Sequence, residues 1–235
     1  MIEVKDLSDP ALSKLIKTKR RVVLIPMGSI EQHGSHLPVS TDSDIVSEVA
    51  RRLSEKTGFI LLPTINYGVS FEHHPRFNLS ISKSTLQKFL IDLCTSLSKN
   101  KINYIIILNG HHGNQPSLKN IPKIMNKITR GKVQVSVFSY WHFMKRKFDH
   151  AGFVETSIML AISKKVDMKK AQSGFNIDKY SEKQQNRLNK LASRSFLAVT
   201  KNGVWGDPTK ATAKDGKMIL SEIVQNLLKE SNLPY

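Results

Sequence analysis

The sequence of 235 residues contains a single cysteine, Cys94, which excludes an intramolecular disulfide. No run of apolar residues reaches the length that a membrane helix needs. The opening residues, MIEVKD, lack the basic and then apolar pattern of a secretory signal. These absences predict a cytoplasmic protein that does not enter a membrane.

Acidic residues are also scarce, since 19 Asp and Glu stand against 36 Lys and Arg, giving a formal net charge of +17. Such an excess can indicate a nucleic-acid-binding protein, which is the non-enzymatic alternative for this chain. The basic residues are scattered, however, and their densest stretch, residues 179–201, contains only Tyr180 and Phe196 as aromatic residues. Solvated helix faces explain this pattern better, so we expect no nucleic-acid partner. The surface would still suit an anionic small molecule such as a phosphate ester.

Alternating strand and helix patterns predict an α/β fold. Apolar runs predict buried strands over residues 21–28, 59–65, 104–110 and 133–141. Helical patterns occupy residues 43–56, 84–98, 115–127, 154–164 and 211–229. This alternation indicates a mainly parallel central sheet with helices on both faces, a three-layer α/β/α arrangement. Residues 1–235 are expected to form a single domain, with the polar stretch 167–201 as a possible insertion or arm.

Two of the predicted helices carry more detailed signals. An apolar stripe marks one face of the helix over 84–98 and consists of Leu86, Phe89, Leu90, Leu93 and Leu97. Cys94 lies four residues after Leu90, so we expect a packed core thiol there rather than a nucleophile. Asn114 is a candidate N-cap for the helix over 115–127, whose Pro116 lies in the first turn.

All eight histidines lie between residues 33 and 150, and several directly follow a predicted strand. The polar residues at these strand ends are Glu31 and His33, then His111 and His112, then His142 and His150. Ligands of open α/β sheets bind at the carboxyl ends of the strands. Carboxylates and imidazoles gathered at such an edge suit a divalent transition metal.

Each of these residues also has an ordinary structural interpretation. Asp42 precedes a helix and could be its N-cap, and Glu155 could complement a helix dipole. His73 and His74 could lie in an exposed loop, and His142 could be a half-buried residue at a strand end. The metal-site interpretation therefore depends on the whole set and not on any single residue.

Four sequence blocks resemble the creatininase (creatinine amidohydrolase) family. Residues 28–42, GSIEQHGSHLPVSTD, are similar to its longest signature. Three further blocks match in the same order: NGHHGN at 109–114, DHAGFVETS at 149–157 and GVWGDPTKATAKDG at 203–216. The loop FEHHPRFNLS at 71–80 departs from the family's Phe-Pro-Gly-Thr pattern. The chain is identified as a member of the family on these motifs.

The resemblance implies a three-layer domain with two divalent ions, which could be Fe, Zn or Mn. The positions that match family metal ligands are Glu31, His33, Asp42 and His111, with Asp42 bridging the ions. His150 matches a catalytic histidine, and we expect His36 to lie behind the ligands or on the substrate side. A glutamate ligand of creatinine-cleaving members is replaced by Gly113, and we expect Glu155 to supply the missing carboxylate.

The implied reaction is hydrolysis of a non-peptide C–N amide bond by a metal-activated water, with His150 protonating the departing nitrogen. The preferred substrate is a formamidopyrimidine ribonucleotide monophosphate. Its deformylation releases formate, as in the archaeal branch that serves riboflavin and coenzyme F420 biosynthesis. Creatinine or another cyclic amide is an alternative that Gly113 disfavours, and a mycofactocin-type peptide-trimming hydrolase is a third. By analogy with the family we also expect a homo-oligomer.

Overall fold

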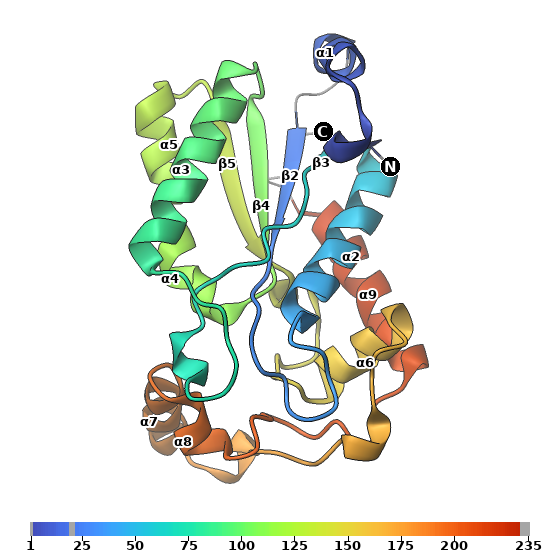
Figure 1. Ribbon diagram of the computed structural model, residues 1–235, viewed down its shortest axis with the longest axis vertical. Coiled ribbons are helices and arrows are strands. Elements are labelled where there is room, and N and C mark those ends of the chain that lie inside the picture. Colours follow the sequence, from blue (N-terminus) through green and yellow to red (C-terminus); the bar gives the residue numbers. More distant parts are fainter. Residues whose placement is uncertain (1, 19–21, 231–235) are drawn as a thin grey trace.

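The protein is described by a computed structural model that covers residues 2–18 and 22–230 (Figure 1). Its centre is a parallel sheet with the strand order β1–β3–β2–β4–β5. The strands are β1 (Ile2–Glu3), β2 (Val22–Met27), β3 (Ile60–Leu61), β4 (Tyr104–Asn109) and β5 (Gln134–Ser139). The predicted parallel sheet is therefore confirmed, and β1 adds an edge strand that the sequence patterns did not indicate.

Helices cover both faces of the sheet, which confirms the three-layer α/β/α architecture (Figure 1). One layer consists of α2 (Thr41–Thr57), α6 (Phe153–Ile162) and α9 (Ala213–Leu228). The opposite layer contains α3 (Lys83–Lys99), α4 (Gln115–Leu118) and α5 (Ile121–Thr129), and α1 (Asp9–Thr18) packs against the same core. The remaining α-helices, α7 (Glu182–Ala192) and α8 (Phe196–Thr200), lie beyond the carboxyl ends of the strands.

The side chains of the central strands alternate between two hydrophobic cores. In β2, Val22 and Leu24 pack beneath α2, α6 and α9, while Val23 and Ile25 pack into the opposite core. Successive side chains of a strand point to opposite faces, so a strand covered on both sides must be apolar at every position. This requirement explains the continuous apolar runs in the sequence.

Within the first core, α9 approaches α6 unusually closely. A Cβ atom added at Gly216 of α9 would overlap the carbonyl oxygen of Ser157 in α6. Ile219, Leu220 and Ile223 of α9 are 4% exposed or less, so most of the apolar side of this helix is buried. Glycine at position 216 allows the two backbones to come together.

Prolines shorten two of the predicted elements. The strand predicted over 59–65 ends after Leu61, because Pro63 has no N–H to donate to a sheet. The helix predicted over 115–127 is divided into α4 and α5, and Pro122 lies in the first turn of α5. Proline inside a continuous helix would clash with the carbonyl four residues earlier, so the break is a direct consequence of this residue.

Two local predictions were wrong and one was confirmed. The Asn114 side chain makes no N-cap; its amide binds the Val69 N–H at 2.9 Å and the Gly28 carbonyl at 3.0 Å. Phe89 is 47% exposed, so the buried stripe of α3 is narrower than its sequence pattern. Cys94 is fully buried, as expected of a core thiol.

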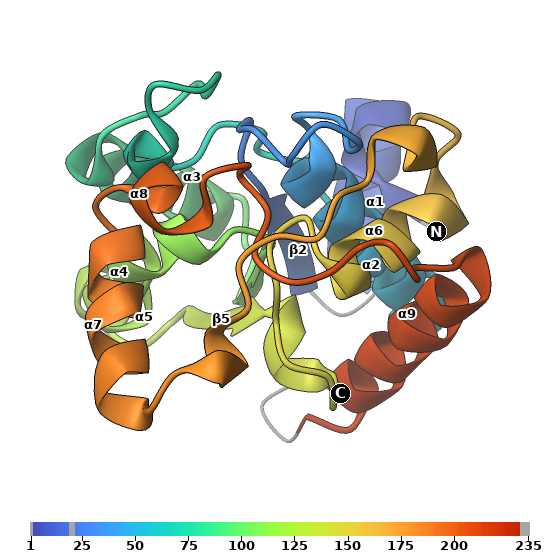
Figure 2. The ribbon, with the colours of Figure 1, turned by 90° about the horizontal axis from the view of Figure 1, so that it is seen from below.

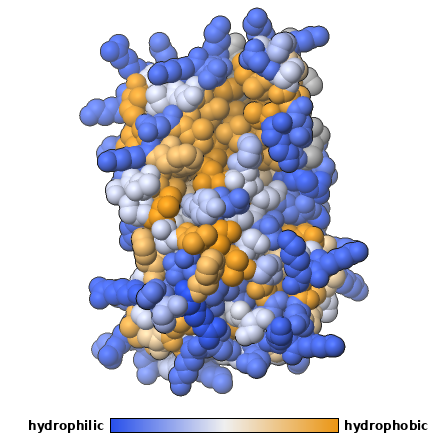
Figure 3. Space-filling model, viewed as in Figure 1, coloured by the Kyte–Doolittle hydropathy of each residue, from blue (hydrophilic) through white to orange (hydrophobic). Residues whose placement is uncertain are grey.

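The face of the molecule shown in Figure 3 carries both hydrophilic and apolar side chains. Hydrophilic side chains project all around the outline in Figure 3, while apolar ones gather over the middle of this face. Among the described residues, no helix is long and apolar enough to span a bilayer.

Candidate metal centre

The segment from the end of β2 to the first turn of α2 carries three of the predicted site residues, Glu31, His33 and Asp42, to the carboxyl edge of the sheet. It folds back on itself through a hydrogen bond from the Glu31 N–H to the Val39 carbonyl, at 3.0 Å. The end of β2 lies directly against the start of α2, since a Cβ at Gly28 would be 2.5 Å from the Ser43 backbone. Asp42, in the first turn of α2, thereby returns to the position of Glu31 and His33.

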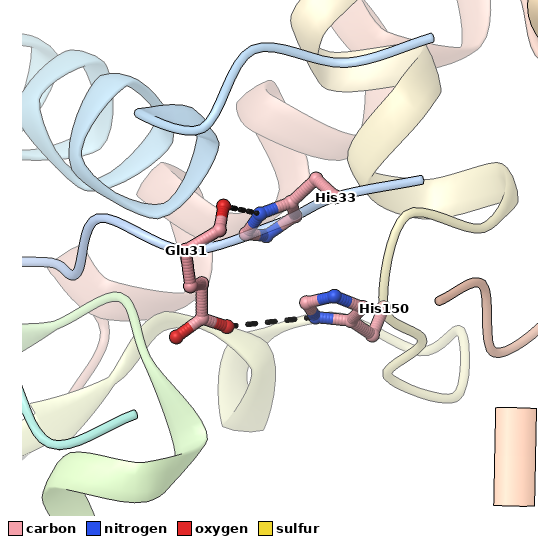
Figure 4. A group of neighbouring side chains, drawn as sticks. All are labelled: Glu31, His33 and His150. Carbon is pink, nitrogen blue, oxygen red and sulfur yellow. Dashed lines mark hydrogen bonds and ion pairs between the residues drawn. The ribbon is translucent and has the colours of Figure 1, made fainter. Parts of the chain in front are cut away.

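Other elements bring the remaining residues to the same place. His111 lies two residues after the end of β4, His150 lies in the loop before α6, and Glu155 is in the first turn of α6. The ligand atoms of these residues form three groups in which all atoms lie within 4.8 Å of one another. The groups are Glu31, Asp42 and His111; His33, Asp42 and Glu155; and Glu31, His33 and His150, the last drawn in Figure 4.

Asp42 is shared by the first two groups and lies between two imidazoles. Its Oδ1 is 3.2 Å from His33 Nε2, and its Oδ2 is 3.0 Å from His111 Nδ1. Glu155 Oε2 lies 3.6 Å from the same His33 nitrogen, and Glu31 Oε2 lies 3.3 Å from His111 Nε2. Each imidazole therefore faces two carboxylates.

Three of the buried carboxylate oxygens have no hydrogen-bond partner. Glu31 and Glu155 are fully buried and Asp42 is 2% exposed. Neither oxygen of Glu31 accepts a hydrogen bond, and Asp42 Oδ2 accepts none. Burying a carboxylate without a partner costs free energy, which a coordinated cation would offset. The mixture of oxygen and nitrogen donors fits divalent zinc, iron or manganese.

The orientation of His33 also suits a metal ligand. Its Nδ1 lies 3.0 Å from the main-chain oxygen of Glu31, which can only accept, so Nδ1 carries the proton (Figure 4). The Nε2 is then the nitrogen that is left for a cation, and it lies beside the Asp42 and Glu155 carboxylates. Metal-binding histidines are commonly fixed in this way by a carbonyl behind the ring.

The carboxylates dominate the electrostatics of this cluster. Burial alone would lower the pKa of His33 and of His111, but the adjacent carboxylates, Asp42 foremost for His33 and Glu31 for His111, raise both pKa values to about 10. Burial by itself would raise the pKa of Asp42, yet the two imidazoles hold it well below its usual range. The cluster thus attracts positive charge at two neighbouring positions.

Two further groups are shifted mainly by burial. Burial raises the pKa of Glu155 to about 8, although the nearby His33 acts in the opposite direction. Burial, together with the neighbouring rings of His33 and His73, holds the pKa of His150 well below its ordinary value.

Sequence reasoning missed two residues that contact this cluster. His73 is 2% exposed rather than part of an open loop, and its Nε2 lies 3.1 Å from Glu31 Oε1. The Nε2 of the buried Gln32 lies 2.9 Å from His73 Nδ1 and 3.2 Å from His150 Nε2. The loop of His73 is brought here by the bridge between Glu31 and Asn78, which no local pattern signals.

Four histidines besides His73 lie outside the candidate ligand groups, and the first of them, His74, is exposed. His112 and His142 are exposed beside the Trp141 ring. His36 is buried behind the ligands, with its Nε2 2.9 Å from Thr156 Oγ1 and its Nδ1 without a hydrogen-bond partner. This position agrees with the expectation that His36 does not coordinate directly.

The structure also explains why position 113 is glycine. A Cβ there would overlap the Val69 carbonyl oxygen and come within 2.8 Å of Glu72 Oε1. A glutamate at this position has no room. A third carboxylate is instead present in the cluster at Glu155.

Comparison with known proteins decides the family. Residues 5–230 match the creatininase family, described as creatinine amidohydrolase. The chain belongs to the creatininase family. A relative from Mycobacterium ulcerans, named mycofactocin precursor peptide peptidase, is 32% identical over 87% of this chain and 82% of its own.

Further relatives cover the chain at lower identity. A Methanocaldococcus infernus protein is named 2-amino-5-formylamino-6-ribosylaminopyrimidin-4(3H)-one 5'-monophosphate deformylase. It is 27% identical over 92% of this chain and 94% of its own. Among solved structures, a creatininase variant of the Zn–Zn type shares the fold at 22% identity, with a TM-score of 0.83 over 97% of this chain and 95% of that one.

As a creatininase-family member, the protein is a hydrolase that acts on C–N bonds. The predicted family and fold are confirmed. The individual ligand assignments, the single domain, the cytoplasmic location and the homo-oligomer stay predictions.

Proposed function

We propose that this chain is a two-metal amidohydrolase. One ion would be held by Glu31, Asp42 and His111, and the second by His33, Asp42 and Glu155, with Asp42 bridging. The observation that carries the proposal is the sharing of Asp42 by two buried donor groups, in which both oxygens of Glu31 and the Oδ2 of Asp42 lack hydrogen bonds. Iron, zinc and manganese all accept these donors.

Bound divalent ions would supply a water whose pKa falls from about 15.7 toward about 7, and a Lewis acid for the carbonyl oxygen. His150 transfers a proton from the attacking water to the departing nitrogen. Its Nε2 lies 3.0 Å from the Gln32 main-chain oxygen, to which it can only donate, so the neutral ring leaves Nδ1 unprotonated. That Nδ1 faces Glu31 Oε1 at 3.8 Å (Figure 4). It is placed to take the proton of the attacking water and pass it on.

The bond changes in this reaction balance without a further reactant. The water oxygen forms a bond to the carbonyl carbon, and the carbon–nitrogen bond breaks. The electron pair leaves with the nitrogen, which receives the proton that His150 took from water. The products are a carboxylic acid and an amine.

The finer proposal for the substrate is a formamidopyrimidine ribonucleotide monophosphate, whose deformylation would belong to riboflavin and coenzyme F420 biosynthesis. The deformylase from Methanocaldococcus infernus supports it through similarity over nearly the full length of both chains. Among the described residues, no buried polar side chain is a lysine or an arginine. The phosphate would therefore meet basic groups at the rim, where Arg76 is half-buried.

A peptide is the second candidate substrate, because the mycofactocin precursor peptide peptidase is 32% identical to this chain, against 27% for the Methanocaldococcus infernus deformylase. Creatinine is the third, and the absence of a glutamate at Gly113 counts against it.

The test combines metal analysis with three substrate assays. Metal-free protein is loaded with Zn, Mn or Fe, and formate release, peptide cleavage and creatine formation are then measured in parallel. We expect up to two ions per chain and formate release from the formamidopyrimidine nucleotide. Asp42→Asn should lose both ions and turnover, whereas Asp44→Asn, in the same helical turn but outside the donor groups, should retain both. Protein that takes up none of these metals would refute the binuclear site.

A further inference from the structure

The polar arm, residues 167–201, is fastened to the segment that carries His150. The Phe175 N–H donates to the Val204 carbonyl at 2.9 Å, and the Gly206 N–H donates to the Phe175 carbonyl at 2.9 Å. Trp205, between these two, exchanges hydrogen bonds of 3.1 and 2.8 Å with the His150 backbone. Phe175 of the arm is therefore tied, through residues 204–206, to the backbone of the catalytic histidine.

The two helices of the arm differ in what they contact. On α7, Ala192 is the only buried residue, so this helix is largely exposed to solvent. The shorter α8 lies between α7 and the 3-10 helix Phe71–His73 at the catalytic edge (Figure 2). Lys201, just after α8, accepts a hydrogen bond of 3.3 Å through its carbonyl from the Arg76 guanidinium. The end of the arm is thus held against the loop that carries His73.

The side chain that α8 directs toward this edge is Phe196, which is half-buried. Its ring centroid lies 4.7 Å from that of His150 in an edge-to-face arrangement, and 4.6 Å from that of His73. On another side the ring lies nearly parallel to Trp205, with centroids 6.2 Å apart. The position of the Phe196 ring is therefore fixed by three other rings.

We propose that Phe196 is a specificity-determining residue that contacts the amine side of the scissile bond and favours amines carrying a flat ring. The proposal rests on the proposed function, because His150 there passes its proton to the departing nitrogen. The Phe196 ring, whose centre lies 4.7 Å from that of His150, would be within reach of a group carried by that nitrogen. Aromatic pairs are favourable at centroid separations of roughly 4.5–7 Å, so a planar amine gains a contact that a compact one lacks.

The first experiment compares two formamides that differ in the amine. Formanilide and N-formylpropylamine are assayed with the wild type, Phe196→Leu and Phe196→Tyr. Phe196→Leu should lower the aryl-over-alkyl ratio of kcat/KM by roughly 2- to 12-fold, mainly through the KM of formanilide. Phe196→Tyr, which keeps the ring, should preserve the ratio. Leu191→Ala, on the exposed face of α7, is the matched control and should change neither substrate.

The second experiment does not depend on turnover. Binding of aniline, the departing amine, is measured by saturation-transfer NMR on the metal-loaded protein. Phe196→Leu should weaken it by a similar factor, with unchanged metal content, and Leu191→Ala should not.

The two experiments distinguish failure of the proposed function from failure of the proposed amine subsite. If no formamide is cleaved but aniline binding still depends on the ring at 196, the proposed function is wrong and the amine subsite stands. If formamides are cleaved and both the ratio and aniline binding are the same in Phe196→Leu as in the wild type, the subsite is overturned. An equal effect in Leu191→Ala would also overturn it, by reducing the role of Phe196 to folding of the arm.

Discussion

Replacing Glu155 by glutamine tests the proposed second metal position. The carboxylate is fully buried, and its Oε2 is 3.6 Å from His33 Nε2 while accepting the Ala151 N–H at 2.7 Å. Glutamine keeps the size and can still accept that hydrogen bond through its carbonyl oxygen, so Glu155→Gln should fold. The change removes the carboxylate that Glu155 would present to a cation in the group formed with His33 and Asp42.

The magnitude follows from Coulomb's law. A unit positive charge at His33 Nε2, 3.6 Å from Glu155 Oε2, is attracted by about 5 kcal/mol at an effective dielectric constant of about 20. Desolvation of the buried carboxylate offsets part of this attraction. Outer-shell partners alone change metal affinity by about 10- to 100-fold, so loss of a direct ligand should cost at least about 100-fold, or roughly 3 kcal/mol.

The assay is metal analysis after equilibration against a buffered metal concentration, together with calorimetric titration. Glu155→Gln should bind one ion tightly where the wild type binds two, because the group of Glu31, Asp42 and His111 is intact. Glu72→Gln is the control: its carboxylate is 3.9 Å from His111 Nε2 and outside the three donor groups. Two tightly bound ions in Glu155→Gln would refute the assignment of this residue.

Three further outcomes follow from other parts of the molecule. Removal of metal should lower Tm by roughly 5–10 °C if the ion was present at about 100 times its Kd. An unchanged Tm in a thermal scan would contradict stabilisation of the folded state by metal binding. Gly216→Ala should lower the free energy of unfolding by about 1–3 kcal/mol in a urea titration, because its Cβ overlaps the Ser157 carbonyl; equal stability would show that α9 can shift. Burial would raise the pKa of Glu48, but Arg51 and Arg52 lower it overall. Because this pKa is depressed, the Glu48 carboxylate stabilises the fold above about pH 4, and the stabilisation is lost as the pH falls further. The difference in free energy of unfolding between the wild type and Glu48→Gln should therefore disappear in acid.

The parts of the site that follow strands were predictable from the sequence. His111 directly follows one apolar run and His33 comes five residues after another, and parallel strands end at one edge, so their proximity needs only the fold class. The proline breaks were equally accessible, since Pro63 and Pro122 are visible in the sequence and act through local backbone chemistry.

The contacts of site residues that lie on irregular loops were not predictable in this way. His73 looked like an exposed loop residue because its segment has no hydrophobic period, and its burial depends on the long-range pairing of Glu31 with Asn78. The contact of Phe196 with His150 has the same origin, since 46 residues of chain separate the two and α8 has only five residues. Single-sequence patterns carry local preferences, whereas these contacts depend on how separate loops pack together.

The close packing of α9 on α6 has a consequence for the order in which the protein matures. Glu155 lies on α6, whose backbone at Ser157 is braced by Gly216 of α9. During synthesis, α9 is the last described helix to be made, long after the segments that carry the histidines. A nascent chain that has reached residue 200 holds every histidine but lacks the helix that supports Glu155. Under the proposed assignment, binding of the second ion should therefore follow the synthesis of α9.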